Sequence, residues 1–269
     1  MNAVWGTAGY AEAADTLAVQ YEEVAFDEVH RDVLQLIPAQ PARILDVGAG
    51  TGRDAAALVA RGHRVVAAEP TSELRTHGQR IHKNSAIDWV DDALPELSLS
   101  QHLGRFDAVF ATAVWMHLNA EERRRAMARV VALLVPGGRF FVDLRHGPVP
   151  DGRRMFDVSA AETVQLGTAY GLQTLHRSEC PDLRGRDSVW WSCLVFKAID
   201  AAESLKLSLA GRTGSLPSRG VSLLSAHLAG PPCRGPQPGE RIESVRRGQG
   251  CGAGTRPVKN GADGTIVIL

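Results

Sequence analysis

The chain has 269 residues, and its 30 Lys and Arg residues balance its 30 Asp and Glu residues, so it carries no net basic charge that would attract nucleic acid. Hydrophobic residues make up 44% and charged residues 22%, as in an ordinary globular protein. No apolar run approaches the ~20 residues that a membrane helix needs, and the N-terminus has no secretory signal pattern. We therefore expect a cytoplasmic protein that binds neither membranes nor nucleic acid.

The composition changes near residue 199. None of the Trp, Tyr or Phe residues lies after Phe196, and the remaining sequence is rich in Gly, Pro and Arg. Such a segment buries too little apolar surface to offset its ordering entropy. We expect residues 200–269 to be a disordered tail behind a folded part.

Four cysteines are present, and they form neither a CxxC pair nor a metal-ligand spacing. In a cytoplasmic protein this arrangement indicates free thiols and no metal site. The four residues are Cys180, Cys193, Cys233 and Cys251.

Short apolar runs alternate with amphipathic stretches along the folded part. Residues 11–37 have helical periodicity and stop before Pro38. The apolar runs predict seven strands, at 43–47, 64–69, 87–90, 106–112, 139–144, 173–176 and 189–198. The stretches between them predict five helices, at 53–61, 72–82, 94–102, 120–134 and 159–170. The Pro136-Gly137-Gly138 segment is expected to end the fourth of these helices.

Strands separated by helices imply right-handed crossovers and a mostly parallel sheet covered by helices on both faces. No helix separates the last two strands, so a hairpin is expected there and the final strand should be antiparallel. Ligands bind such sheets beyond the carboxyl ends of the strands, where the strand order reverses.

The first strand runs into a glycine-rich turn, Asp46-Val-Gly48-Ala-Gly50-Thr-Gly52. Glycines let the backbone approach a ligand at the start of a helix, although a tight structural turn would use them too. The dinucleotide fingerprint places its third glycine at position 53, which is Arg53 here, and this counts against NAD.

Acidic residues follow the next two strands. Glu69, before Pro70, is placed to accept hydrogen bonds from ribose hydroxyls, or it is an ordinary acid at a strand end. After the third strand come Asp91 and Asp92. We favour Asp92 as the acceptor for an adenine amino group, with the Ala93 N–H beside a ring nitrogen.

Taken together, these motifs resemble the class I S-adenosylmethionine-dependent methyltransferases. The segments that carry the resemblance are ILDVGAGTG, Glu69, Asp92-Ala93, FDAVFATAVWMHL and LLVPGGRFFV. The resemblance implies an α/β fold, a three-layer αβα sandwich with a seven-stranded sheet of order 3-2-1-4-5-7-6 and strand 7 antiparallel. It implies S-adenosylmethionine as cofactor and SN2 methyl transfer to an O, N or S nucleophile of a small molecule.

The resemblance also assigns residues to the cofactor. Asp46 and the Ala111 carbonyl would meet its amino group, and residues 1–40 would form a helical lid over it, with Tyr10, Tyr21 and Phe26, ahead of a main domain at 41–199. The full cofactor set is Asp46, Gly48, Ala49, Gly50, Gly52, Glu69, Pro70, Asp92, Ala93 and Ala111.

The acceptor side is less defined. His117 and His146 follow the fourth and fifth strands and are candidate general bases, although each also suits a structural role. Trp115 is a candidate wall of the substrate pocket, and Arg145 would pair with an anionic substrate or with a surface acid.

The fourth strand is followed by neither N/D-P-P-Y/F nor Pro-Cys, which disfavours DNA amino and pyrimidine C5 methylation. We expect a monomer or homodimer with a small-molecule substrate. The alternatives are a non-catalytic module that binds S-adenosylmethionine and a NAD-dependent oxidoreductase.

Overall fold

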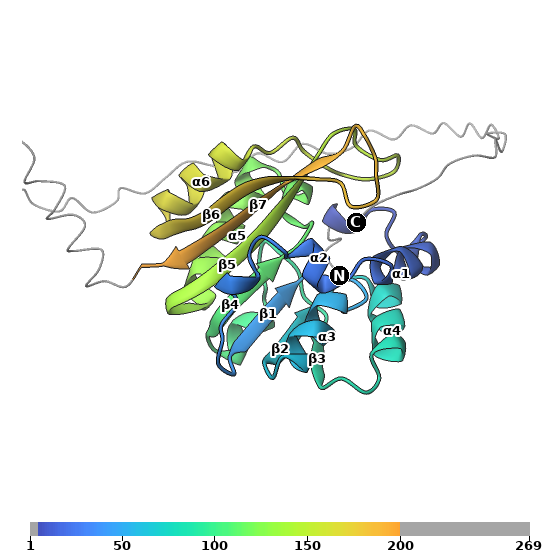
Figure 1. The fold of residues 1–269 in the computed structure, drawn as a ribbon, viewed down its shortest axis with the longest axis horizontal. Helices are drawn as coiled ribbons and strands as arrows, with labels where there is room; N and C mark the ends of the chain where they lie inside the picture. Colours follow the sequence, from blue (N-terminus) through green and yellow to red (C-terminus); the bar gives the residue numbers. More distant parts are fainter. Residues whose placement is uncertain (1–4, 200–269) are drawn as a thin grey trace, which may run out of the picture. The chain divides into compact units, whose positions relative to one another are not determined.

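The computed structural model describes residues 5–199, in which a seven-stranded sheet lies between helices (Figure 1). The strand order is β3-β2-β1-β4-β5-β7-β6. The strands are β1 (Arg43–Val47), β2 (Arg64–Ala68), β3 (Ile87–Val90), β4 (Phe106–Ala111), β5 (Leu134–His146), β6 (Leu172–Pro181) and β7 (Trp190–Ala198).

The pairing confirms the predicted topology. β1 lies between β2 and β4 and is parallel to both, and β5 is parallel to β4. β7 is antiparallel to β5 and to β6, as the missing helix between the last two strands predicted. The strand order therefore reverses between β1 and β4, and this point positions the cavities described below.

Helices cover both faces of the sheet. On one face, α2 (Phe26–Val29) and α3 (Arg53–Ala60) contribute Phe26, Ala55 and Leu58 to a core cluster with residues of β1, β4 and β5. In that cluster the rings of Phe110 and Phe141 stack with centroids 4.2 Å apart.

On the opposite face, α5 (Ala120–Leu133) buries an apolar stripe, and α6 (Ala160–Ala169) packs beside it over β6 and β7. Asn119 begins α5 with a capping box, in which its side chain accepts from the Glu122 N–H and the Glu122 side chain accepts from the Asn119 N–H.

The single helix predicted over residues 11–37 is wrong. The segment contains α1 (Ala14–Glu22), the short α2 and a 3-10 turn at Leu34–Leu36, with extended backbone at Ala25. Its apolar side chains serve two different clusters. Leu17 packs against Leu74 of α4 (Ser72–Ile81), whereas Phe26 and later residues pack against α3 and the sheet. One straight helix cannot reach both.

Two further predictions of local structure are corrected. Residues 94–102 form turns and a 3-10 helix at Ser100–Leu103 instead of an α-helix. The Pro136-Gly137-Gly138 segment lies inside β5, which begins directly after α5. There the β4–β5 register shifts between Phe106 and Ala108, and a Cβ on Gly138 would lie 2.9 Å from the Val135 carbonyl oxygen.

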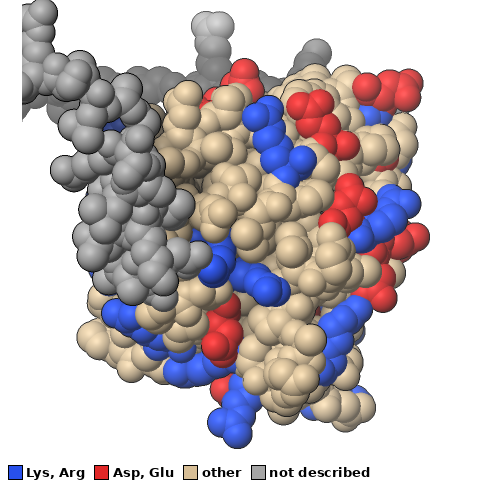
Figure 2. All heavy atoms as spheres, turned by 60° about the vertical axis from the view of Figure 1, so that its left-hand side comes forward, with Lys and Arg blue, Asp and Glu red and all other residues tan. Residues whose placement is uncertain are grey.

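Residues 1–4 and the predicted tail, 200–269, lie outside the described residues, and so do Cys233 and Cys251. Among residues 5–199 no helix is both long and apolar enough to cross a membrane. On the face drawn in Figure 2, basic and acidic side chains of the described part are interspersed among other residues.

The close packing of α4 generates a prediction. Glycine to alanine in a helix usually stabilises it, by about 1 kcal/mol. A Cβ on Gly78, however, would lie 2.5 Å from the Thr51 carbonyl oxygen and 2.5 Å from the Trp89 ring. We expect G78A to lower the free energy of unfolding by about 1–3 kcal/mol, as overpacking does, measured by urea denaturation. T76A, at an exposed position of the same helix, should change it by less than about 0.5 kcal/mol. A G78A protein as stable as the parent would contradict this packing.

Candidate functional site

Two adjoining cavities open at the carboxyl ends of the central strands. Cavity A lies over the ends of β1 and β2 and is lined by Glu69, Pro70, Leu74, Ala93 and His117, among others. Cavity B reaches from the glycine loop across to β5 and β7. The two share a wall, which consists of Tyr21, Gly48, Gly50, Thr112 and Ala113.

The glycine loop between the cavities requires its glycines. Gly48 has φ of +65°, and a Cβ there would lie 2.4 Å from Cγ2 of Val114. Gly50 has φ of +58°, and a Cβ there would lie 3.1 Å from the Tyr21 ring. Since L-residues rarely adopt these angles, larger residues would be strained at both positions.

Glu69 holds this loop in place. One carboxylate oxygen accepts from the Gly50 N–H at 2.8 Å, and the other accepts from the Thr71 N–H at 2.8 Å. Burial raises the pKa of Glu69, while these backbone hydrogen bonds partly oppose the rise. Each oxygen keeps a further lone pair that a ligand in cavity A can use.

Three residues predicted to bind a cofactor have other contacts. The Asp92 carboxylate accepts from the Leu99 and Ser100 N–H groups, at 3.0 and 2.7 Å, and lines neither cavity. Gly52 precedes α3, against the Trp89 ring, and Ala111 is buried inside β4. Their contacts with a cofactor stay predictions. Asp91 pairs with Arg75 and lines neither cavity.

A row of polar side chains runs across the sheet in cavity B. On three neighbouring strands, an apolar core residue and a polar residue are separated by two positions. In each pair the polar residue lies closer to the edge of the sheet at which β4 ends. The pairs are Phe110 and Thr112 near β4, Phe141 and Asp143 on β5, and Val195 and Cys193 on the antiparallel β7. Because side chains alternate along strands, each polar residue lies on the same face as its apolar partner. Asp46 of β1 lies on the same face, opposite Phe110, and also lines cavity B.

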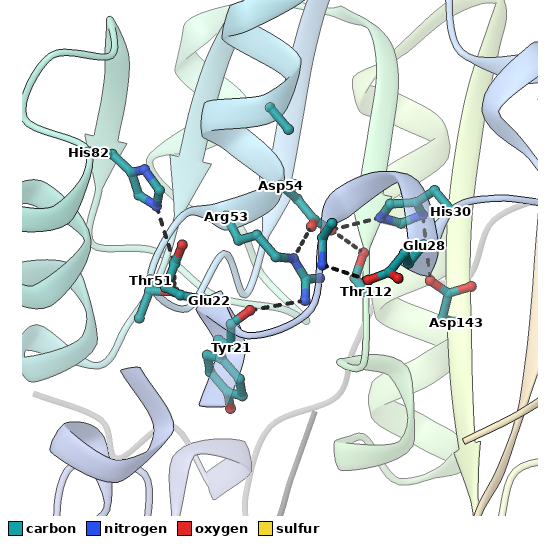
Figure 3. Close-up of polar contacts among 12 residues, drawn as sticks. Tyr21, Glu22, Glu28, His30, Thr51, Arg53, Asp54, His82, Thr112 and Asp143 are labelled. Carbon is teal, nitrogen blue, oxygen red and sulfur yellow. Dashed lines mark hydrogen bonds and ion pairs between the residues drawn. The ribbon is translucent and has the colours of Figure 1, made fainter. Parts of the chain in front are cut away.

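His30, just after α2, covers this row from above (Figure 3). Its Nε2 lies 2.8 Å from the Asp54 carboxylate, and its Nδ1 lies 3.9 Å from the Asp143 carboxylate. Asp54 also accepts from Arg53 Nε at 2.8 Å and from the Thr112 hydroxyl at 3.0 Å. The His30 ring is fixed between the Phe26 and Phe110 rings.

Three of the acids that line cavity B, Asp46, Asp54 and Asp143, differ electrostatically. Burial by itself would raise the pKa of Asp54, but the neighbouring Arg53 and His30 hold this pKa well below its ordinary value. Burial, with the nearby Asp54 charge, raises the pKa of Asp46 well above its ordinary value. Burial also raises the pKa of Asp143, despite the opposing effect of His30. Asp46 Oδ2 is buried with no hydrogen-bond partner among the described residues.

Of the two candidate bases, His117 lies in cavity A with both nitrogens engaged. Its Nδ1 is 2.7 Å from the Arg154 carbonyl oxygen and therefore donates, so Nε2, 3.0 Å from the Tyr10 hydroxyl, accepts. Burial lowers the pKa of His117 and raises the pKa of Tyr10 to about 12, which keeps the imidazole neutral and the hydroxyl protonated. His117 thus ties the N-terminal segment to the loop after β4.

Three other predicted residues lie away from both cavities. β5 runs on to His146, so Arg145 and His146 are paired with Trp191 and Trp190 of β7 instead of lying in a loop. His146 stacks on Trp190 and contacts the Ser192 hydroxyl at 2.9 Å, and Arg145 donates to the Pro148 carbonyl. The expectation that these residues follow β5 in a loop is corrected; neither lines cavity A or B, and their contacts with a substrate stay predictions.

Trp115 is also corrected. Its side chain is fully buried in the core, edge-on to the Phe140 ring, so it is no pocket wall.

His30, Thr112, Asp54 and Asp143 were missed in the sequence. Asp143 carries a signal, because it is a charged residue inside the apolar run Phe140–Leu144. His30 carries none, since only the tertiary packing of α2 brings it over the sheet.

Comparisons with known proteins agree with this geometry. Residues 44–138 match the family model described as "Methyltransferase domain". Demethylmenaquinone methyltransferase of Clavibacter sepedonicus is 33% identical over 123 residues, which are 45% of this chain and 49% of that protein. Phosphoethanolamine N-methyltransferase 1 of Triticum aestivum is 29% identical over 120 residues, 43% of this chain and 24% of that protein. The chain thus spans half or less of the length of these two relatives.

Solved structures share the fold. The N-methyltransferase NodS from Bradyrhizobium japonicum, in complex with S-adenosyl-L-homocysteine, matches with a TM-score of 0.55 and 16% identity over 71% of this chain and 100% of that chain. The 1,6-didemethyltoxoflavin-N1-methyltransferase of Burkholderia thailandensis, with bound S-adenosylhomocysteine, matches with a TM-score of 0.50 and 23% identity over 71% and 88%. At these identities the likeness establishes the fold.

The unpartnered Asp46 carboxylate generates a prediction. An acid whose pKa is raised on folding costs stability once the pH exceeds its pKa in the unfolded chain, near 3.9. We therefore expect D46N to raise the free energy of unfolding at pH 8 by at least about 1 kcal/mol, and the gain to vanish near pH 4. Urea denaturation across this range measures it. D88N, the same change at an exposed position of β3, should show no such pH-dependent gain. A D46N protein less stable than the parent at pH 8 would contradict the assignment.

Proposed function

We propose that this chain, a member of the class I S-adenosylmethionine-dependent methyltransferase family, is an enzyme that transfers a methyl group from S-adenosylmethionine to a small molecule. The observation that carries the proposal is the glycine loop, held by Glu69, with one cavity on each side of it. A donor in cavity A and an acceptor in cavity B would meet at their shared wall.

The residues of cavity A fit the nucleoside part of this cofactor. Glu69 offers carboxylate lone pairs to a ribose diol, and Pro70, Leu74, Ala93 and Leu94 offer an apolar slot to a flat ring. These contacts explain why a buried acid with a raised pKa is kept at the end of β2.

The shared wall and cavity B fit the other end of the cofactor. The backbone at Gly48 and Gly50 leaves room for a chain to pass over the loop, because any Cβ there would meet Val114 or Tyr21. Beyond the loop, the unpartnered Oδ2 of Asp46 is complementary to an ammonium group. Asp46, Gly48, Ala49, Gly50, Glu69, Pro70 and Ala93 would thus hold the cofactor.

When bound, S-adenosylmethionine supplies an electrophilic methyl group on a sulfonium. The contribution of the chain is alignment of the acceptor atom with the methyl carbon and exclusion of water. Tyr21 lines both cavities and Tyr10 lines cavity A, so the N-terminal segment forms part of the wall that shields the reacting atoms. His117 fixes that segment through the Tyr10 hydroxyl.

A small-molecule acceptor suits the lining of cavity B. Apolar side chains and a few polar groups line it together, as is typical of small-molecule sites. By their names, the relatives act on acceptors as different as a demethylmenaquinone and phosphoethanolamine. The identity of the acceptor therefore has to be inferred from the side chains that line cavity B.

The alternative of a NAD-dependent oxidoreductase finds less support. Arg53, where the dinucleotide fingerprint has its third glycine, extends over the loop, with Nε on Asp54 and Nη1 3.4 Å from the Tyr21 carbonyl oxygen. A non-catalytic module would have the same cavity A, and turnover separates it from an enzyme.

Titration calorimetry with S-adenosylhomocysteine tests the proposal, with NADH as the competing ligand. We expect the parent protein to bind S-adenosylhomocysteine and E69A to bind it about 10- to 150-fold more weakly, as for the loss of hydrogen bonds to a charged group worth about 1.5–3 kcal/mol. E73A, at an exposed position of α4, should bind like the parent. Thermal denaturation verifies that E69A is folded.

Binding of NADH without binding of S-adenosylhomocysteine would overturn the proposal. An E69A variant that is folded and binds as tightly as the parent would overturn the assignment of Glu69 to the ribose.

A further inference from the structure

The lining of cavity B has more acidic groups than the cofactor uses. Building on the proposed function, we propose that the methyl acceptor is an amine, bound in cavity B with its nitrogen at Asp143, and that the Asp143 carboxylate takes the proton that this nitrogen loses.

The first step in the argument is the charge of the lining. Asp54 is neutralised within the protein, because it pairs with both Arg53 and His30. Asp46 and Asp143 have no arginine or lysine within ion-pair distance among the described residues. At the mouth of cavity B, Arg31 is accompanied by the two acids Glu28 and Asp32. The charged residues that line the cavity are Glu28, Arg31, Asp32, Asp46, Arg53, Asp54 and Asp143.

This lining selects the charge of the ligand. A carboxylate or phosphate entering cavity B would face the Asp46 and Asp143 carboxyls in a site shielded from water, where like charges repel strongly. A cation entering there would supply a hydrogen-bond donor to Asp46 Oδ2, which has none, and a full positive charge beside Asp143. Asp46 lies beside the glycine loop and suits the ammonium of the donor. Asp143 lies two strands further along the sheet, so it remains for the acceptor.

The surroundings of Asp143 indicate the shape of the acceptor. Beyond it, cavity B is lined by Val29, Pro181, Leu183 and Trp191, so an apolar arm fits next to the charged end. Trp191 is held by its Nε1, which donates to Asp182 at 3.1 Å. An amine on a short aryl or alkyl chain combines both properties.

The reaction itself favours nitrogen at this place. In the displacement, the lone pair of a neutral amine forms the N–C bond while the C–S bond breaks and its electron pair stays on sulfur. Positive charge moves from sulfur to nitrogen, so a carboxylate beside the nitrogen stabilises the transition state more than the ground state. A thiolate or carboxylate acceptor would lose negative charge there and gain nothing from Asp143.

The proton balance runs through Asp143. An amine that arrives as an ammonium passes one proton through Asp143 to solvent before attack, so the carboxyl is ionised again when positive charge develops on nitrogen. The product leaves as the N-methylammonium. The His30 ring contacts Asp54 through Nε2 at 2.8 Å, and its Nδ1 lies 3.9 Å from the Asp143 carboxylate. His30 is thus a positioning residue, because its pairing with Asp54 fixes the ring over Asp143.

The test uses matched acceptors on several aryl and alkyl skeletons, for example 2-phenylethylamine, 2-phenylethanol, 3-phenylpropanoate and 2-phenylethanethiol. S-adenosylhomocysteine formation by the full chain is measured, and products are identified by mass spectrometry. We expect at least one amine to be N-methylated at least 10-fold faster than its matched alcohol, acid and thiol. Preference for any of the other three classes overturns the proposal, and so does turnover of no amine by protein that binds S-adenosylhomocysteine.

Variants locate the effect. D143N should lower kcat for the amine at least 100-fold and leave the Kd for S-adenosylhomocysteine within 2-fold of the parent. D27N is the same change on α2 outside both cavities, and it should leave kcat within 2-fold. Thermal denaturation confirms folding of both. Unchanged kcat in D143N overturns the role of Asp143, whereas loss of S-adenosylhomocysteine binding by the parent protein removes the proposed function as well.

Discussion

The hydrogen bond from the Gly50 N–H to the Glu69 carboxylate is the contact on which the site depends. It joins the loop after β1 to the end of β2, so the loop cannot move independently of the sheet. The Gly48 and Ala49 N–H groups both reach the Ala68 carbonyl oxygen, at 2.7 and 3.2 Å, which secures the loop from its other side. Two cavities with one rigid shared wall follow from this arrangement.

The fold of the central sheet was predictable from the sequence because its determinants are local. Apolar runs and glycine stops predicted the strands, and the absence of a helix before β7 predicted the antiparallel strand. The strand order was implied by the family resemblance, and the structure confirms both the order and the antiparallel strand. Strand ends were less predictable. β5 was expected to stop at Leu144, and its extension to His146 depends on pairing with β7, a partner distant in the sequence. That extension pairs Arg145 and His146 with β7 instead of leaving them in a loop.

The donor side of the site was more predictable than the acceptor side for the same reason. Gly48, Gly50 and Glu69 belong to short motifs at strand ends, and all three line cavity A. The polar row depends instead on register, since Thr112, Asp143 and Cys193 share a face only once three strands are paired. Its cover, His30, comes from a segment whose periodicity suggested one long helix. No local pattern could have placed it there.

The acids of cavity B also show how stability and function oppose each other in this fold. Asp46 and Asp143 occupy positions that the apolar core would otherwise extend into, and burial raises the pKa of each. Such groups destabilise the ligand-free protein at neutral pH, and they become favourable when a cationic ligand supplies an opposite charge. The sequence therefore retains carboxylates that folding alone would select against.

A crystal structure of the full chain with S-adenosylhomocysteine tests the central claim most directly. The account predicts the nucleoside in cavity A, with both ribose hydroxyls on the Glu69 carboxylate, and the ammonium within hydrogen-bond distance of Asp46 Oδ2 on the far side of the glycine loop. A ligand that lies outside cavity A, or that leaves Glu69 without a contact to the ribose, would contradict it.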